Sequence, residues 1–165
     1  MRKLLAYVAI LVFLAWAVTR IVISVQFERA AGGYLKRAAD ANVIELAIQN
    51  LEVTVQYLDR EGLTEGYTSV LWRTPDEDVG FWYVNLNASL VELRGVSPDA
   101  TPLERSNVLM KLRETLLDGS EITAPSGISI FPSNTVFFLW GWFGLALFCA
   151  VVAGPIVRSV RDDLF

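Results

Sequence analysis

The sequence lacks most of the residues on which catalytic and metal sites depend. It has no histidine and a single cysteine, Cys149, among 165 residues. These absences exclude histidine-based triads, histidine metal sites and, within one chain, zinc clusters and disulfide bonds. We therefore expect a non-enzymatic protein with no catalytic residues, no cofactor and no metal.

Positive charge is also scarce. The chain has 14 Lys and Arg residues against 18 Asp and Glu residues, and its pI is about 4.8. A nucleic-acid partner needs a basic surface, so this balance argues against one. Apolar residues make up 53% of the chain, which is above the usual range. Because the surplus lies at the two ends, the composition indicates a membrane protein with a water-soluble middle and the lipid bilayer as a partner.

Two apolar runs have the length of a membrane span. Residues 4–25 would form a helix of roughly 33 Å, which matches a bilayer core of about 30 Å. Residues 134–157 carry no charge, and most of their aromatic residues lie near the start of the run. Aromatic side chains are typical of the membrane–water interface. Both runs are therefore predicted to be transmembrane helices.

Lysine and arginine near the ends of the spans set the direction of insertion. Both termini, residues 1–3 and 158–165, are predicted in the cytoplasm, with residues 26–133 on the outer side of the cytoplasmic (inner) membrane. This middle segment carries 9 basic and 16 acidic residues, a net charge of −7, which keeps it soluble. The basic residues that carry this prediction are Arg2, Lys3, Arg158 and Arg161.

The first run also has the parts of a cleavable signal peptide, ending in the cleavage-like Ala15-Trp16-Ala17. An uncleaved signal anchor is favoured, because the apolar run resumes after Arg20. We expect the Arg20 side chain to extend to the headgroups. The alternative is intramembrane pairing of Arg20 with an acidic group of a partner, since neither span contains a carboxylate.

The best periodic pattern in the middle segment predicts one helix over residues 34–60. Gly32-Gly33 should break the chain just before it, because consecutive glycines cost about 2 kcal/mol of helix propensity relative to alanine. Apolar residues in the predicted helix recur at steps of three, four and seven, which keeps one face apolar. These residues are Tyr34, Ala41, Ile44, Ile48, Leu51, Val55 and Leu58.

Two later helices are predicted to start at capping boxes. Thr74-Pro75-Asp76-Glu77 and Thr101-Pro102-Leu103-Glu104 each place threonine at the N-cap, proline at the first helical position and glutamate three residues after the cap. The first helix should end before Gly95 and the second at Gly119. The residues expected to face the core are Val79, Trp82, Leu86, Leu90, Leu93, Leu109, Leu112 and Leu116.

The remaining pieces complete the predicted fold. Residues 67–72 are too short to assign by period, so a helical turn and an extended stretch both stay open. Residues 120–133 contain two prolines and should be extended. The expected fold class is an all-α membrane protein in which two transmembrane helices enclose an extracytoplasmic antiparallel bundle of three helices plus an extended arm.

Two clusters qualify as candidate sites. The acidic triplet Asp76-Glu77-Asp78 is best interpreted as helix capping, because carboxylates favour the positive end of the helix dipole. The aromatic residues Trp72, Phe81, Trp82 and Tyr83 suit either core and arm packing or a partner or ligand surface. Three consecutive aromatic residues cannot all face one core on a helix, so at least one of them should lie elsewhere.

The favoured hypothesis is a two-span membrane accessory or scaffold protein whose outer bundle binds a protein partner in the cell envelope. The alternative is a ligand-binding sensory module that acts through a separate membrane protein, with a pocket near Trp72 and Trp82. The sequence is also compatible with a homo-oligomer. No residue in the sequence identifies the partner.

Overall fold

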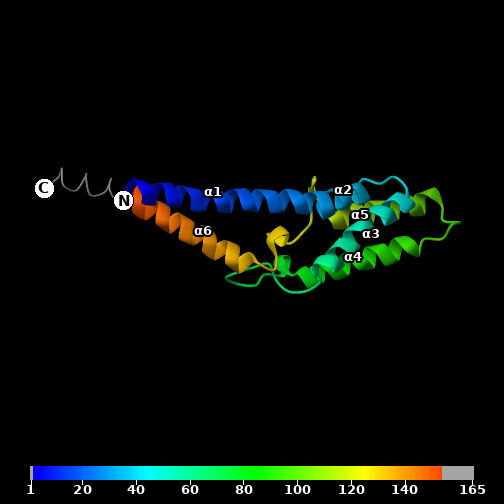
Figure 1. Ribbon diagram of the computed structural model, residues 1–165. Helices are drawn as coiled ribbons and strands as arrows, with labels where there is room; N and C mark the ends of the chain where they lie inside the picture. Colours follow the sequence, from blue (N-terminus) through cyan, green and yellow to red (C-terminus); the bar gives the residue numbers. More distant parts are fainter. Residues whose placement is uncertain (1, 154–165) are drawn as a thin grey trace. The chain divides into compact units, whose positions relative to one another are not determined.

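The computed structural model describes residues 2–153 and is mostly helical (Figure 1). The described chain divides into two compact units. Residues 2–23 and 133–153 form the span unit, and Ser24–Pro132 form the domain. The expected mostly helical chain with two candidate membrane-spanning helices is confirmed. Arg158 and Arg161 lie outside the described residues, as do the side chains of Arg2 and Lys3, so the orientation stays a prediction.

The span unit is built from two apolar helices. Helix α1 covers Arg2–Phe27, and helix α6 covers Asn134–Phe148 and continues into a π-helical turn, Cys149–Ala153. Both are long and apolar enough to cross a membrane. Most side chains along them are exposed within the single chain, as expected for helices that face lipid.

Small residues let α1 and α6 approach each other closely. A Cβ atom added to Gly141 would lie 3.0 Å from the indole ring of Trp16, and Gly144 is buried against Phe13. The Trp16 indole N–H donates a 2.8 Å hydrogen bond to the carbonyl oxygen of Phe137. Close backbone approach and interhelical hydrogen bonds are what hold helices together where no hydrophobic driving force exists.

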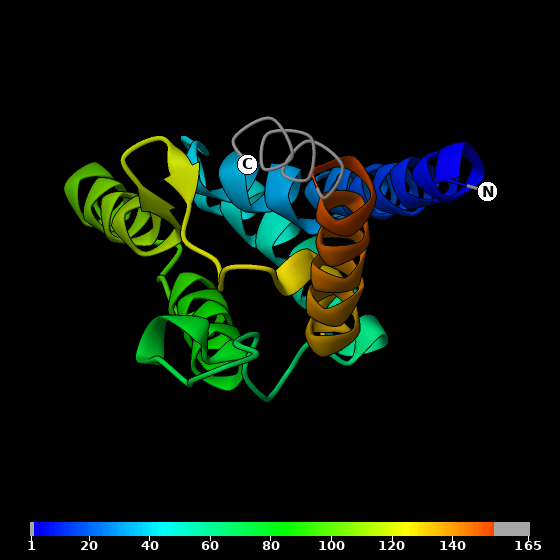
Figure 2. The same cartoon turned by 90° about the vertical axis from the view of Figure 1, so that its left-hand side faces the viewer.

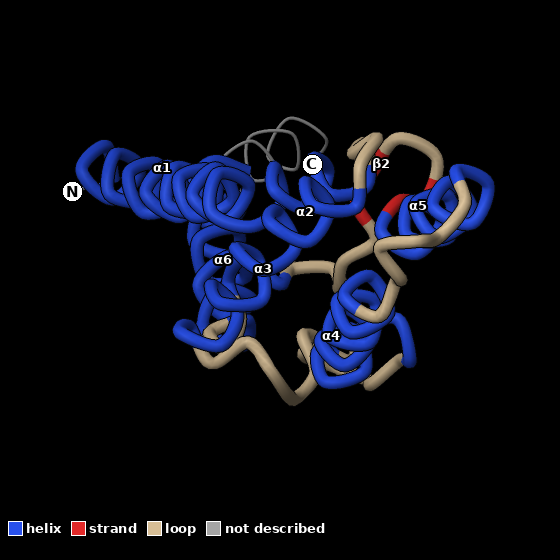
Figure 3. Tube along the Cα trace, turned by 90° about the vertical axis from the view of Figure 1, so that its right-hand side faces the viewer, coloured by secondary structure: helices blue, strands red, loops and turns tan. Residues whose placement is uncertain are grey.

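The domain contains four helices, a small hairpin and short turns. Helix α3 packs against α2, α4 and α5, and α2 also packs against α5 (Figure 3). The strands β1 and β2 pair antiparallel, with Leu117 opposite Ile122 and Asp118 opposite Glu121. The elements are the π-helical turn η1 (Glu28–Gly32), α2 (Gly33–Ala39), α3 (Ile44–Glu61), the 3-10 turn η2 (Pro75–Glu77), α4 (Val79–Arg94), α5 (Pro102–Leu116), β1 (Leu117–Asp118), β2 (Glu121–Ile122) and the 3-10 turn η3 (Ile128–Ile130).

One hydrophobic core holds the domain together. Every helix of the domain contributes to it, and so does the arm that follows the hairpin, drawn in yellow in Figure 2. The core begins at Phe27 and Ala31, before α2, and it reaches Ile128 in the arm. Its buried members are Phe27, Ala31, Leu35, Ala38, Ala39, Ile44, Ala47, Leu51, Val55, Leu58, Leu63, Val79, Trp82, Leu86, Leu90, Leu93, Leu112, Leu116, Leu117 and Ile128.

The predicted break at Gly32-Gly33 is wrong. The helix continues through both glycines, and residues 4–39 form one helical stretch. A π-helical turn at Glu28–Gly32 shifts the register there, and the hydroxyl of Thr54 on α3 lies 3.4 Å from the carbonyl oxygen of Ala31. Gly32 and Ala31 are buried, so the small residues let α3 pack against this turn. Tertiary packing therefore outweighs the low helix propensity of glycine.

The predicted single helix over 34–60 is two helices, so the domain has four helices instead of three. The chain turns at Asp40 and becomes extended at Val43, immediately before α3. The predicted apolar seam holds within α3, where Ile44, Leu51, Val55 and Leu58 are buried. The members outside it, Tyr34 and Ala41, are only half-buried, as is Ile48 within α3.

One predicted capping box is confirmed and the other is wrong. The Thr101 hydroxyl accepts from the backbone N–H of Glu104, whose side chain accepts from the backbone N–H of Thr101. Thr74 instead starts the isolated 3-10 turn η2. Helix α4 begins four residues later than predicted, with Asp78 as its N-cap. Asp78 pairs as a β-bridge with Tyr67, which holds it extended and prevents a helix from starting earlier.

The core faces of α4 and α5 follow the predicted pattern. All five residues expected to be buried on α4 are buried, as are Leu112 and Leu116 on α5, while Leu109 is half-buried. The segment 120–133 is only partly extended. It contains strand β2 and the 3-10 turn η3, because the hairpin and the core contacts of Ile128 bend it.

Candidate functional site

An open groove of about 860 Å³ lies on the domain between α4, the β1–β2 hairpin and the loop before α4. This volume falls in the usual range for small-molecule sites, roughly 300–1,000 Å³. Its floor is apolar and its rim is charged. The lining residues are Tyr67, Arg73, Thr74, Pro75, Asp76, Asp78, Phe81, Trp82, Asn85, Leu86, Thr115, Asp118, Glu121, Ile122, Thr123, Ala124 and Pro125.

The predicted aromatic residues divide between three places. Phe81 and Trp82 line the groove. Tyr83 is half-buried on α4 and donates its hydroxyl hydrogen to Asp59 of α3. Trp72 does not line the groove, and it is 72% exposed on the loop before α4. The expectation that consecutive aromatic residues face different surroundings is therefore confirmed.

Trp82 fixes one wall of the groove. It is buried in the core, and its indole N–H donates a 2.6 Å hydrogen bond to the carbonyl oxygen of Thr123. This bond joins α4 to the arm that follows β2. Because an indole N–H has no partner of its own in an apolar core, the Thr123 carbonyl satisfies it at the edge of the groove. Packing of Trp82 against core and arm, one of the two predicted roles, is therefore observed.

Phe81 lies on the opposite face of α4 and is 65% exposed. It begins a stripe of exposed apolar residues at steps of three and four along this face: Phe81, Val84, Ala88 and Val91. Spacing of this kind places all four on one side of a helix. The buried face of α4 is also apolar, so this helix has two apolar faces. We call the four exposed residues the outer stripe.

The rim of the groove is acidic. Asp76, Asp78, Asp118 and Glu121 line it, and Arg73 is the cationic residue among its lining side chains. The backbone N–H of Phe81 donates a 2.9 Å hydrogen bond to Asp78, which lowers the pKa of this carboxyl below its usual value. A further hydrogen bond from the Tyr67 hydroxyl lowers it as well, and the same bond raises the pKa of Tyr67. Asp78 is therefore an anion at neutral pH.

The acidic residues do not form a metal centre. Within residues 2–153, no group of three or more acidic, cysteine or histidine side chains is placed to hold a metal ion. In the predicted triplet, Asp78 caps α4 and Glu77 accepts a 2.8 Å hydrogen bond from the hydroxyl of Thr74. These bonds support the capping interpretation, with the cap at Asp78 instead of Thr74.

Arg20, the other predicted site residue, lies on α1 in the span unit and is half-buried. No salt bridge among the described residues involves it. Neither its predicted extension to the headgroups nor its pairing with a partner is tested, and both stay predictions.

No protein-family model, no curated protein and no solved structure matches this chain.

The hairpin side of the groove was not predicted. Glu121 and Thr123 contribute to it from the segment expected to be an extended arm. Asp118 was expected in the last turn of the helix that starts at Pro102, but that helix ends at Leu116 and Asp118 lies in strand β1. A local signal for the hairpin exists, because Gly119-Ser120 is a two-residue turn of the type that joins antiparallel strands. Gly119 has a φ of 63°, a conformation that glycine adopts without steric cost.

Proposed function

We propose that this chain is a non-enzymatic, two-span accessory protein of the cytoplasmic membrane whose domain lies outside the cytoplasm and binds a protein partner in the cell envelope. The two apolar helices support the membrane location. The basic residues at both ends of the chain support cytoplasmic termini. The partner surface consists of the groove and the outer stripe of α4.

The outer stripe is the observation that carries this proposal. A helix on the surface of a stable monomer normally has one apolar face and one polar face. Helix α4 has apolar residues on both, and Phe81 joins its outer stripe to the groove. From Phe81 to Val91 the stripe runs ten residues, or roughly 15 Å. A surface of this length suits a partner helix better than a small ligand.

The rim of the groove indicates the chemistry of the partner. Four carboxylates against one guanidinium favour a basic segment, and an acidic domain attracts such a segment from a distance. We therefore infer that the partner offers an amphipathic helix, with apolar residues for the outer stripe and lysine or arginine residues for Asp118 and Glu121.

The test is photo-crosslinking in intact cells with the full-length chain at its native expression level. A photoreactive residue at Val84 should give an adduct with another protein, and the attached peptide should contain lysine or arginine. The same probe at Gln56, which is exposed on α3, is the matched control and should give none. Charge reversal by Asp118→Lys and Glu121→Lys should abolish the Val84 adduct. Adducts only with lipid, or adducts that survive charge reversal, would contradict the proposed partner.

Thiol labelling tests the orientation separately. In a Cys149→Ser background, a cysteine at the exposed position Glu65 should react with a membrane-impermeant reagent in intact cells, whereas one at Arg2 should not. Reaction at Arg2 would place the amino terminus outside and overturn the assigned topology.

The groove favours one alternative, a ligand-binding sensory module. Its volume and the aromatic side chains of Phe81 and Trp82 suit an organic cation. A ligand in the groove would block a probe at Phe81 but leave one at Val91 free, because Val91 lies three turns along the helix. A protein partner would engage both positions, so the two probes separate the alternatives.

A further inference from the structure

We propose that the loop before α4 inserts its tip, Leu71 and Trp72, into the outer interface of the membrane. Leu71 and Trp72 lie outside the groove and outside the outer stripe, although the residues that follow them in the loop, from Arg73 to Asp76, line the groove. It rests on the membrane location in the proposed function, but not on the protein partner.

The loop is closed at its base and apolar at its tip. The backbone N–H of Thr68 donates a 3.0 Å hydrogen bond to the carbonyl of Glu77, and the N–H of Val79 donates a 2.9 Å bond to the carbonyl of Gly66. We call residues 68–77 the Leu71 loop. Surface loops of this length whose ends lie close together are frequently functional.

The tip has the composition of a membrane anchor. Leu71 is 65% exposed and Trp72 is 72% exposed, although loops in contact with water are normally polar. Tryptophan favours the headgroup level of a bilayer, where its ring is in apolar surroundings and its N–H reaches water. Arg73 follows directly, and its guanidinium carbon lies 4.9 Å from the ring centre of Tyr67. This position holds a positive charge beside the tip, where it suits lipid phosphates.

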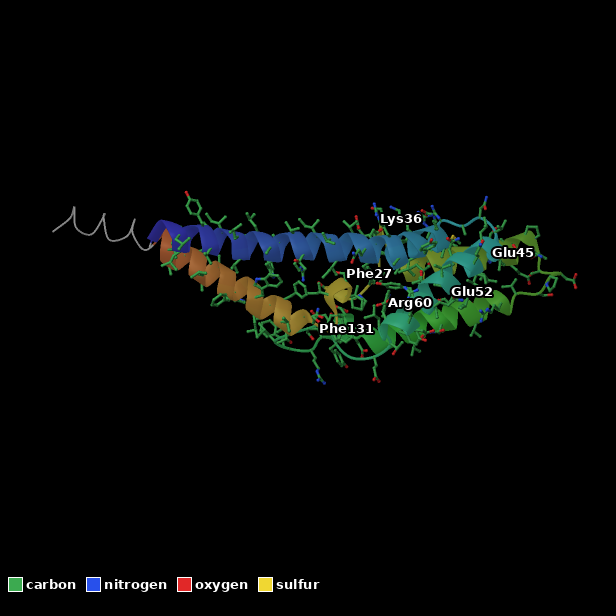
Figure 4. All side chains as sticks on the ribbon, viewed as in Figure 1. Phe27, Lys36, Glu45, Glu52, Arg60 and Phe131 are labelled. Atoms are coloured by element: carbon green, nitrogen blue, oxygen red, sulfur yellow. The ribbon has the colours of Figure 1, made fainter. Side chains whose placement is uncertain are left out.

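The base of the loop is anchored next to the start of the second span. Gly66, with a φ of 102°, packs so closely on Phe131 that an added Cβ atom would lie 2.9 Å from the ring. Phe131 (labelled in Figure 4) is only three residues before Asn134, the first residue of α6. Three residues span at most about 11 Å, so the base of the loop is held near the membrane by the chain itself.

Connectivity also limits how far the tip can be from the bilayer. Leu71 is five residues from Gly66, a distance of at most about 18 Å. The apolar tip and its short connection to the start of the second span make the bilayer the occupant that fits this surface.

Spin labelling of the full-length chain in lipid nanodiscs tests the proposal. In the Cys149→Ser background, single cysteines replace three exposed leucines: Leu71 at the loop tip, Leu11 on α1 and Leu46 on α3. Collision rates of each nitroxide with oxygen and with a water-soluble nickel complex report whether it lies in lipid or in water. We expect the Leu71 label to favour oxygen, as the Leu11 label does, and the Leu46 label to favour the nickel complex.

Each other outcome overturns the proposal in a recognisable way. If the Leu71 label behaves as the Leu46 label does, the loop is in water. If it shows spin–spin broadening, a second copy of the chain covers the tip. If the Leu11 label is also accessible from water, the membrane location fails, and the proposed function fails with it. The nanodiscs contain no other protein, so a missing protein partner would not affect these results.

Discussion

Leu51→Ala should strongly destabilise the domain. Leu51 lies in the middle of α3, the helix that contacts the other three helices of the domain, and it is 0% exposed. Removing a fully buried leucine side chain loses its transfer free energy and leaves a cavity, at a cost of about 2 to 5 kcal/mol. A domain of this size has about 5 to 15 kcal/mol in total. The substitution should therefore remove a large share of its stability.

Leu46→Ala is the matched control. Leu46 is on the same helix and undergoes the same chemical change, but it is 46% exposed. Its truncation should cost under about 1 kcal/mol, because much of the side chain is already in water. Glu52 (labelled in Figure 4) is less suitable as a control, although it is next to Leu51 in the sequence. It forms a 2.6 Å salt bridge with Arg94 of α4 and is half-buried.

Hydrogen exchange measured by mass spectrometry on the full-length chain gives the required readout. The slowest amides of α3 exchange by unfolding of the whole domain, so their rates follow its stability. Each 1.4 kcal/mol changes the rate tenfold, so Leu51→Ala should accelerate exchange about 30-fold to 4,000-fold. Leu46→Ala should accelerate it less than about fivefold. Equal acceleration in the two variants would refute the assigned core face of α3.

Two further predictions address the two threonines expected to cap helices and the packing of α1 against α6. Thr101→Ala should lower the free energy of unfolding by about 1 kcal/mol, because it removes the N-cap of α5. Thr74→Ala should lower it by less than about 0.5 kcal/mol, because the Thr74 hydroxyl caps no helix N–H. Hydrogen-exchange rates of peptides from α5 and α4 would compare the two variants. Gly141→Leu should separate α1 from α6 by displacing Trp16, while Ala146→Leu on the exposed face of α6 should not. Spin-label distances across the helix pair in nanodiscs would show the separation, and unchanged distances in the Gly141 variant would count against the packing.

Local chemistry was sufficient to predict the elements whose signals lie within a few residues of one another. The Thr101 capping box satisfies its own N–H groups, so it needs no help from the rest of the fold. The core face of α4, from Val79 to Leu93, could be predicted because every step is three or four residues. Phe81 and Trp82 are adjacent, so a helix necessarily directs them differently, and the structure places one outside and one inside.

Elements that depend on distant contacts could not be predicted in the same way. The turn between α2 and α3 covers residues 40–43 and contains Ala41, which lies three residues before Ile44, so the apolar pattern continues across the turn without an interruption. The two glycines at 32 and 33 remain helical because α3 packs on them, with the hydroxyl of Thr54 at the Ala31 carbonyl. The cap of α4 moved from Thr74 to Asp78 because Asp78 pairs with Tyr67, eleven residues earlier in the chain.

The candidate site shows the same division. Its aromatic residues could be named from the sequence, because three consecutive aromatic side chains on a helix cannot all face one core, and at least one of them must lie at a surface. Its opposite wall could not, since the hydrogen bond from Trp82 to Thr123 joins residues 41 positions apart. A groove of this kind exists only when the hairpin and the arm have packed against α4. Its acidic rim is likewise assembled from two separate segments of the chain.

The first span and the domain share one helix, and this determines where the domain begins. From Leu4 to Val25 the helix is apolar on all sides except at Arg20 and a few small polar residues, whereas beyond Val25 only one side is apolar and buried, at Phe27, Ala31, Leu35 and Ala38. These residues pack with the core of α3, α4 and α5. A soluble fragment that started at α2 would lose Phe27 and Ala31 and leave their core contacts open to water. The smallest fragment that retains the core therefore starts at the last turn of the span, where the two apolar patterns meet.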